Sequence, residues 1–92
     1  MAAVEEVDHW VQLGRVIRDG RARSGLTQHA LAERAGVSRA WLARVESGHR
    51  KAEIEYLMLT LAALDLSLAV VPRTPPDVDP ELAEALRRAG LA

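Results

Sequence analysis

The chain of 92 residues is 49% hydrophobic but holds only three aromatic residues, so we expect one small domain with a core of leucine, valine, isoleucine and alanine. It has no cysteine, which excludes disulfides, thiolate zinc sites and cysteine nucleophiles. No apolar run is long enough to cross a membrane, and the N-terminus is acidic. Neither a transmembrane helix nor a secretory signal is therefore expected, which favours a cytoplasmic protein.

Charge is distributed unevenly along the chain, although the net charge is only −1. From His9 to Lys51, nine arginine and lysine residues stand against three acids, a net charge of +6. The remainder carries three arginines against ten acids, a net charge of −7. A basic segment within an acidic chain is typical of a module that binds a polyanion.

The residues after an expected leader, 1–8, predict a first helix from about His9 to Arg23, ended by Ser24-Gly25. Gly14 and Gly20 weaken this helix without breaking it. Its inward positions recur at helical spacing and are Trp10, Leu13, Val16 and Ile17.

Two short helices follow, joined by a tight turn at Ala35-Gly36-Val37. Thr27 is expected to cap the first helix, which ends at about Ala35, and Ser38 to cap the second, from Arg39 to about Ser47. Gly36 suits the left-handed conformation that ends a helix. The expected inward residues of the pair are Leu31, Ala32, Leu42 and Val45. This arrangement presents the start of the second helix to a DNA groove.

A fourth helix is expected from about Glu53 to Leu64, after a basic loop at residues 49–52. Its expected apolar face consists of Ile54, Leu57, Met58, Leu61 and Leu64. Beyond residue 71, a proline-rich linker leads to a short final helix, Pro80 to Arg88, with acids in its first turns and bases in its last.

The segment Leu66 to Val71 changes to a β-rich pattern that ends at Pro72, and we interpret it as a short strand. A lone strand leaves its backbone N–H and C=O groups without partners, and no second strong strand candidate exists in the sequence. The economical solution is antiparallel pairing with the same strand of a second copy about a two-fold axis. The sequence therefore predicts a homodimer, with dimerisation through Leu66, Leu68, Val70 and Val71.

The pattern Thr27-Gln28-(x)2-Leu31-Ala32-(x)3-Gly36-Val37-Ser38, continued to Glu46-x-Gly48, resembles the Xre (Cro/cI-type) helix-turn-helix family over residues 10–65. The following strand resembles more narrowly the HipB-type antitoxins. The resemblance implies a mainly α, lambda-repressor-like domain of four to five helices over residues 9–71, with one strand that pairs across the dimer. It also implies a repressor of its own operon that reads a palindromic operator and neutralises a kinase-like toxin.

The resemblance further implies a DNA-binding role for ten residues. The outward positions of the recognition helix are Ser38, Arg39, Ala40 and Ala43, with Arg44 near that face; the phosphate contacts are Gln28, Ser47, His49, Arg50 and Lys51. Gln28 would also brace the recognition helix. Arg21 and Glu46 match a buried or half-buried ion pair that ties the first helix to the third.

Several residues allow more than one interpretation. Arg39 can bond guanine O6 and N7 together or be a solvated side chain, and the same alternatives stand for Arg44. Trp41 can pack over the motif or wedge against the DNA backbone, whereas Trp10 is expected in the core or a dimer contact. The scattered histidines give no metal site, and no serine has a catalytic partner, so neither an enzyme nor a cofactor is expected.

The tail, residues 72–92, is either a solubilising terminus or a segment that docks on the toxin through Val78, Leu82 and Leu86. The sequence thus predicts a sequence-specific repressor that is also an antitoxin. The alternative is a stand-alone Xre-type regulator without a toxin partner.

Overall fold

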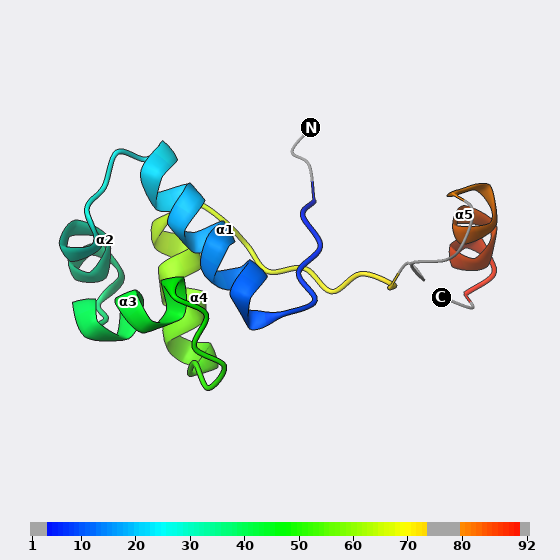
Figure 1. Cartoon of the computed structure of the whole chain (residues 1–92). Helices are drawn as coiled ribbons and strands as arrows, with labels where there is room; N and C mark the ends of the chain where they lie inside the picture. Colours follow the sequence, from blue (N-terminus) through cyan, green and yellow to red (C-terminus); the bar gives the residue numbers. More distant parts are fainter. Residues whose placement is uncertain (1–3, 74–79, 91–92) are drawn as a thin grey trace.

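The computed structural model describes residues 4–73 and 80–90, and the chain forms five helices within them. They are α1 (Trp10–Arg23), α2 (Gln28–Ala35), α3 (Arg39–Glu46), α4 (Ile54–Ala63) and α5 (Pro80–Arg88). The first four make one helical body, and α5 lies apart from it (Figure 1). Each of the five predicted helices is confirmed to within one residue at either end.

The predicted caps of the two short helices are confirmed. Thr27 Oγ1 accepts the backbone N–H of Ala30 at 3.0 Å, and Ser38 Oγ accepts that of Trp41 at 3.0 Å. Gly36 ends α2 with φ of 78°, in the left-handed region that favours glycine. These local bonds fix the start of α3 relative to α2.

The core lies where α1 packs on α3 and where α2 packs on both α3 and α4. It consists of Ile17, Leu31, Ala32, Trp41, Leu42, Val45, Leu57, Leu61 and Leu64. Three residues of the predicted apolar faces lie outside this core, because Trp10 is 41% exposed, Ile54 66% and Met58 49%. For Trp10 this exposure excludes the core and leaves the predicted dimer contact untested. For α4, the helical pattern could not choose a face because the helix is apolar on nearly every side.

Gly14 marks the closest approach of α1 to α3. A Cβ atom built at this position would lie 2.3 Å from the carbonyl oxygen of Val45 and 3.1 Å from that of Glu46. The sequence suggested a residue that merely weakens α1. The structure shows instead that the absence of a side chain lets the two backbones meet.

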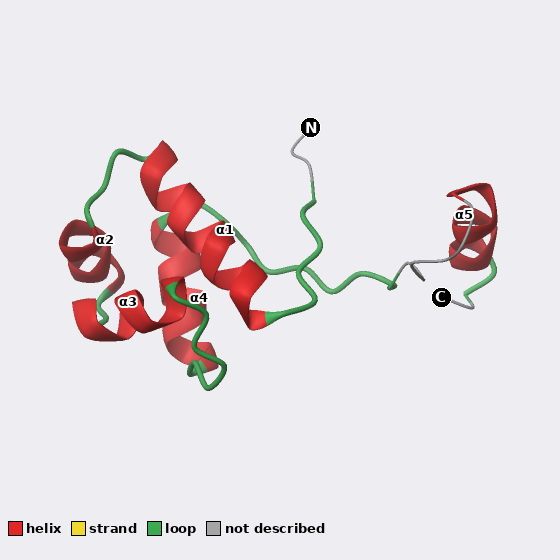
Figure 2. Cartoon of the chain, viewed as in Figure 1, coloured by secondary structure: helices red, strands yellow, loops and turns green. Residues whose placement is uncertain are grey.

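The predicted strand at Leu66–Val71 is not found, and no β-strand occurs in residues 4–73 or 80–90, which Figure 2 colours as helix and loop only. After α4 and its cap residue Leu64, Asp65 has φ of 57°, and the backbone N–H of Leu66 donates to the carbonyl of Leu61 at 2.8 Å. The prediction was wrong for a single copy because a strand is defined by its ladder, and the described residues offer no segment that pairs with this one.

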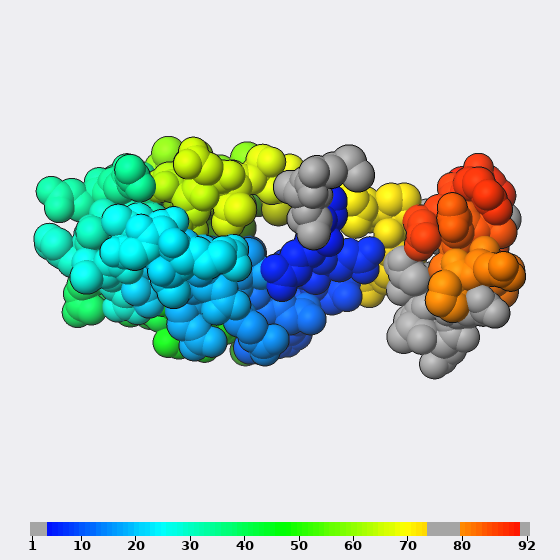
Figure 3. All heavy atoms as spheres, turned by 90° about the horizontal axis from the view of Figure 1, so that it is seen from above, coloured from blue at the N-terminus to red at the C-terminus, as the bar shows by residue number. Residues whose placement is uncertain are grey.

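The chain after Leu66 runs back beside the residues that precede α1. Arg73 Nη2 lies 3.6 Å from Asp8 Oδ1, and Figure 3 shows the corresponding yellow and blue atoms next to each other. Among the described residues, no helix is long and apolar enough to span a membrane.

Candidate nucleic-acid interface

The helix-turn-helix motif is anchored by a buried ion pair between α1 and the end of α3. Arg21 Nε lies 2.8 Å from Glu46 Oε2, and Arg21 Nη2 lies 2.9 Å from Glu46 Oε1. The side chain of Glu46 is only 4% exposed, and that of Arg21 is 19% exposed. The bidentate hydrogen bond to Glu46 raises the pKa of Arg21 above its ordinary value, so the guanidinium stays charged. The predicted ion pair is confirmed, and Glu46 lies beneath the basic surface.

Gln28 connects this ion pair to the exposed start of α3. Its Nε2 donates to Glu46 Oε1 at 3.2 Å, and its Oε1 accepts from Arg39 Nη1 at 3.4 Å. Arg39 itself is exposed, whereas Gln28 is half-buried. A line of polar contacts therefore runs from the buried carboxylate of Glu46 to a guanidinium at the first turn of α3.

The surface of α3 presents most of the residues predicted to read bases. Ser38, Arg39, Ala40 and Arg44 are exposed, and Ala43 is half-buried. Ala43 and Arg44 line an open hollow of about 420 Å³ together with Ser47, Gly48 and His49. The structure thus brings the outward positions of α3 next to the loop that follows it, in which Arg50 and Lys51 are also exposed.

Trp41 belongs to the core, which decides between its two interpretations. It is 4% exposed and its ring contacts Tyr56 edge-to-face, with centroids 5.6 Å apart. Its indole Nε1–H donates to Glu53 Oε2 at 2.6 Å. The indole ties α3 to the first turn of α4 and does not reach outward.

Glu53 is a site residue that the sequence did not single out. It is the N-terminal cap residue of α4, and its pKa is lowered by the hydrogen bond from its own backbone N–H and then by the one from Trp41, with smaller effects of Arg44 and His49. A carboxylate that directly follows a basic loop was the available signal, but only the fold reveals its partner.

The remaining candidate residues lie away from this surface. Leu66 is half-buried against the core, whereas Leu68 is 51%, Val70 98% and Val71 42% exposed. On α5, Leu82 is 53% exposed and Leu86 is half-buried, and Val78 lies outside the described residues.

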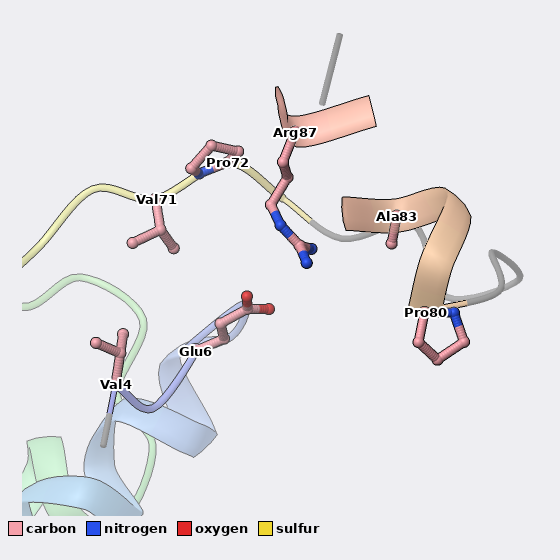
Figure 4. Close-up of a pocket in the computed structure, with 7 residues that line it drawn as sticks. All are labelled: Val4, Glu6, Val71, Pro72, Pro80, Ala83 and Arg87. Atoms are coloured by element: carbon pink, nitrogen blue, oxygen red, sulfur yellow. The ribbon is translucent and has the colours of Figure 1, made fainter. Parts of the chain in front are cut away.

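A second hollow, of about 620 Å³, separates the leader and residues 71–72 from α5. The side chains of Glu6 and Arg87 point into it from opposite sides (Figure 4). No group of acidic, histidine or cysteine side chains within the described ranges could hold a metal ion.

Residues 12–73, about two thirds of the chain, match a family model described as a helix-turn-helix domain. The chain belongs to the helix-turn-helix family. The match confirms the predicted Xre-type resemblance. Members of this family are DNA-binding regulators rather than enzymes, and the chain is one of them. No curated protein sequence matches it.

Solved structures agree with the family. A chain of the HipA-HipB-O2-O3 complex and one of the HipB-O4 20mer complex each have a TM-score of 0.69 and 22% identity, covering 75% of this chain and 97% of their own. The restriction-modification controller protein C.AhdI from Aeromonas hydrophila has 31% identity and a TM-score of 0.60, covering 63% of this chain and 88% of its own. The helix-turn-helix protein thus shares the HipB fold.

Proposed function

We propose that this protein is a dimeric, sequence-specific transcriptional repressor that inserts the start of α3 into the major groove. The observation that carries the proposal is the exposed guanidinium of Arg39, held by Gln28 on the buried Arg21–Glu46 pair. A side chain held in advance loses less conformational freedom on binding, which favours the bidentate contact that distinguishes guanine from other bases.

The predicted DNA-binding residues divide into two groups by the part of the DNA that each is proposed to contact. Base edges are met by Arg39 with Ser38, Ala40, Ala43 and Arg44, where the two alanine methyls suit a thymine methyl. Phosphates are met by Gln28, Ser47, His49, Arg50 and Lys51, which give affinity without sequence information.

The repressor acts as a homodimer on a palindromic operator. Leu68, Val70 and Val71 are exposed on the segment that follows α4. This exposure supports the proposal that the segment pairs with the same segment of a second copy. Leu66 packs against its own core and fixes where the segment begins. Two copies related by a two-fold axis place their recognition helices about 34 Å apart, one turn of DNA.

Binding to the DNA upstream of its own gene tests the repressor proposal. Fluorescence anisotropy with this duplex and a shuffled one, titrated at several salt concentrations, should give at least about 10³-fold tighter binding to the native sequence. Both affinities should fall with salt, because arginine and lysine displace condensed cations. Equal affinity for the two duplexes would reject sequence-specific repression.

The protein is further proposed to be the antitoxin of a kinase-like toxin. The HipB fold and the occurrence of HipB in a complex with HipA support this role. Leu82 offers an exposed apolar contact on α5, on the same helix face as Leu86. Co-expression with the product of the adjacent gene should yield a stable complex, which Leu82→Glu weakens. No complex and no relief of toxicity would leave the stand-alone Xre-type regulator as the better description.

A further inference from the structure

Glu53 occupies the N-terminal cap position of α4 but makes no capping hydrogen bond. Side chains at this position commonly accept from the exposed N–H groups of the first turn. The Oε2 atom of Glu53 accepts instead from the indole Nε1–H of Trp41 at 2.6 Å. This short, charge-assisted hydrogen bond holds the carboxylate beside α3 rather than on its own helix.

In this position the carboxylate lies near two basic side chains that are proposed to meet DNA. Trp41 and Arg44 are three residues apart on α3, so they share a side of the helix. His49 lies in the loop that joins α3 to α4 (Figure 1) and, with Arg44, lines the open hollow of about 420 Å³. The pKa of Glu53 is lowered first by the hydrogen bonds from its own backbone and from Trp41, and further by the charges of Arg44 and His49.

Glu53 is the one exposed acid among the residues between α2 and α4. The other acid there is Glu46, which is buried and paired with Arg21. In the part of the chain that the structure describes, no direct ion pair joins Glu53 to a basic side chain. The basic side chains around the hollow therefore remain available to phosphates, with an exposed negative charge beside them.

A fixed negative charge at this point opposes the approach of DNA phosphates. Like charges repel, and at physiological salt the repulsion extends over a Debye length of about 8 Å. Phosphate contacts give affinity without sequence information, so the repulsion acts on every duplex alike. A carboxylate beside the loop therefore weakens DNA binding without changing which bases α3 reads.

We infer that Glu53, held in place by Trp41, sets the DNA affinity of this protein by offsetting the positive charge of the phosphate-binding loop. The inference rests on the proposed function, since it requires that the basic residues at the end of α3 and in the following loop face DNA phosphates. Binding is then weaker, and less dependent on salt, than those basic residues alone would make it.

Charge-removing variants of the full chain test this role. Glu53→Gln removes the charge and keeps a side-chain oxygen that can accept from the indole. Glu55→Gln is the matched control, because Glu55 is also exposed, lies in the first turn of the same helix and undergoes the same change of net charge. Glu53→Ser removes the charge and offers α4 a capping hydroxyl, so it replaces Glu53→Gln if the latter does not fold.

Fluorescence anisotropy with a shuffled duplex and with the duplex upstream of the protein's own gene gives the affinities. Glu53→Gln should bind both duplexes at least about threefold more tightly at about 50 mM salt, with a smaller gain at about 200 mM. The slope of log affinity against log salt should steepen by up to about 1. Glu55→Gln should leave both affinities and the slope unchanged.

The outcomes separate this inference from the proposed function. If Glu53 only joins α3 to α4, removal of its charge leaves the salt slope unchanged, and that result overturns the inference alone. Equal effects of Glu53→Gln and Glu55→Gln overturn it as well, because they would reflect net charge rather than position. Tighter binding to one duplex only would assign Glu53 to base reading and overturn it too. No binding of the unsubstituted chain to either duplex overturns the proposed function together with the inference.

Discussion

Replacing Gly14 by alanine tests the packing of α1 on α3 where the two backbones are closest. The new Cβ would lie 2.3 Å from the carbonyl oxygen of Val45, whereas a comfortable C···O contact is about 3.3–3.6 Å. The helices must therefore separate by about 1 Å. Overpacking of this kind lowers the free energy of unfolding by about 1–3 kcal/mol, and the higher helix propensity of alanine returns about 0.5–1 kcal/mol.

Gly20→Ala is the matched control, since Gly20 is also a buried glycine of α1. Its nearest neighbours are the Leu64 and Leu66 Cδ1 atoms, at 3.3 and 3.4 Å, and both are ends of side chains that can move. The midpoints of these two ranges leave a net loss of about 1.25 kcal/mol, and at about 4–8 °C per kcal/mol for a domain of this size Gly14→Ala should lower the Tm by roughly 5–10 °C. Gly20→Ala should leave the Tm unchanged or raise it. Thermal unfolding followed by circular dichroism measures both, and equal Tm values would refute the proposed close approach.

Three further predictions concern the interface. Glu46→Ala leaves Arg21 without its carboxylate and releases Gln28, so chemical denaturation should show a loss of about 2–4 kcal/mol, and a loss below 0.5 kcal/mol would contradict an anchoring role. Arg39→Ala should reduce the preference for operator over random DNA by about 1–3 kcal/mol in competition titrations while weak salt-sensitive binding persists, and equal loss on both DNAs would count against base reading. The lowered pKa of Glu53 stabilises the fold above the ordinary glutamate pKa, and this stability is lost as pH falls through the lowered value. The acid transition seen by Trp41 fluorescence should therefore change in Glu53→Gln. An unaltered transition would exclude Glu53 as its source.

Local signals in the sequence predicted most of the helical body. Thr27 and Ser38 cap helices through bonds to N–H groups three residues away, and Gly36 ends α2 through its own backbone. Such features depend on neighbours in the chain, so the five helices were predicted nearly to the residue. The Arg21–Glu46 pair spans a long distance in sequence and was predicted only through the family resemblance.

Features that depend on tertiary contacts were harder to predict. Trp41 suits either a core or a surface position on the pattern of α3, and only its burial, at 4% exposed, together with its contacts to Glu53 and Tyr56 assigns it to the core. From the sequence, Gly14 is expected only to weaken α1. Its role in the packing depends on the carbonyl of Val45, which is distant in the sequence. The β-rich pattern of Leu66–Val71 does not form a strand, because a strand depends on a pairing segment and the described residues offer none.

Selection of binding sites from a pool of random duplex DNA tests most directly whether this helix-turn-helix protein is a dimeric, sequence-specific repressor. We expect enrichment of a two-fold symmetric site whose half-site centres lie about 10 base pairs apart, because two recognition helices about 34 Å apart span one turn of DNA. With the Arg39→Ala chain, the same selection should lose the guanine that the guanidinium contacts. No enriched sequence, or a single half-site without symmetry, would contradict the dimeric repressor.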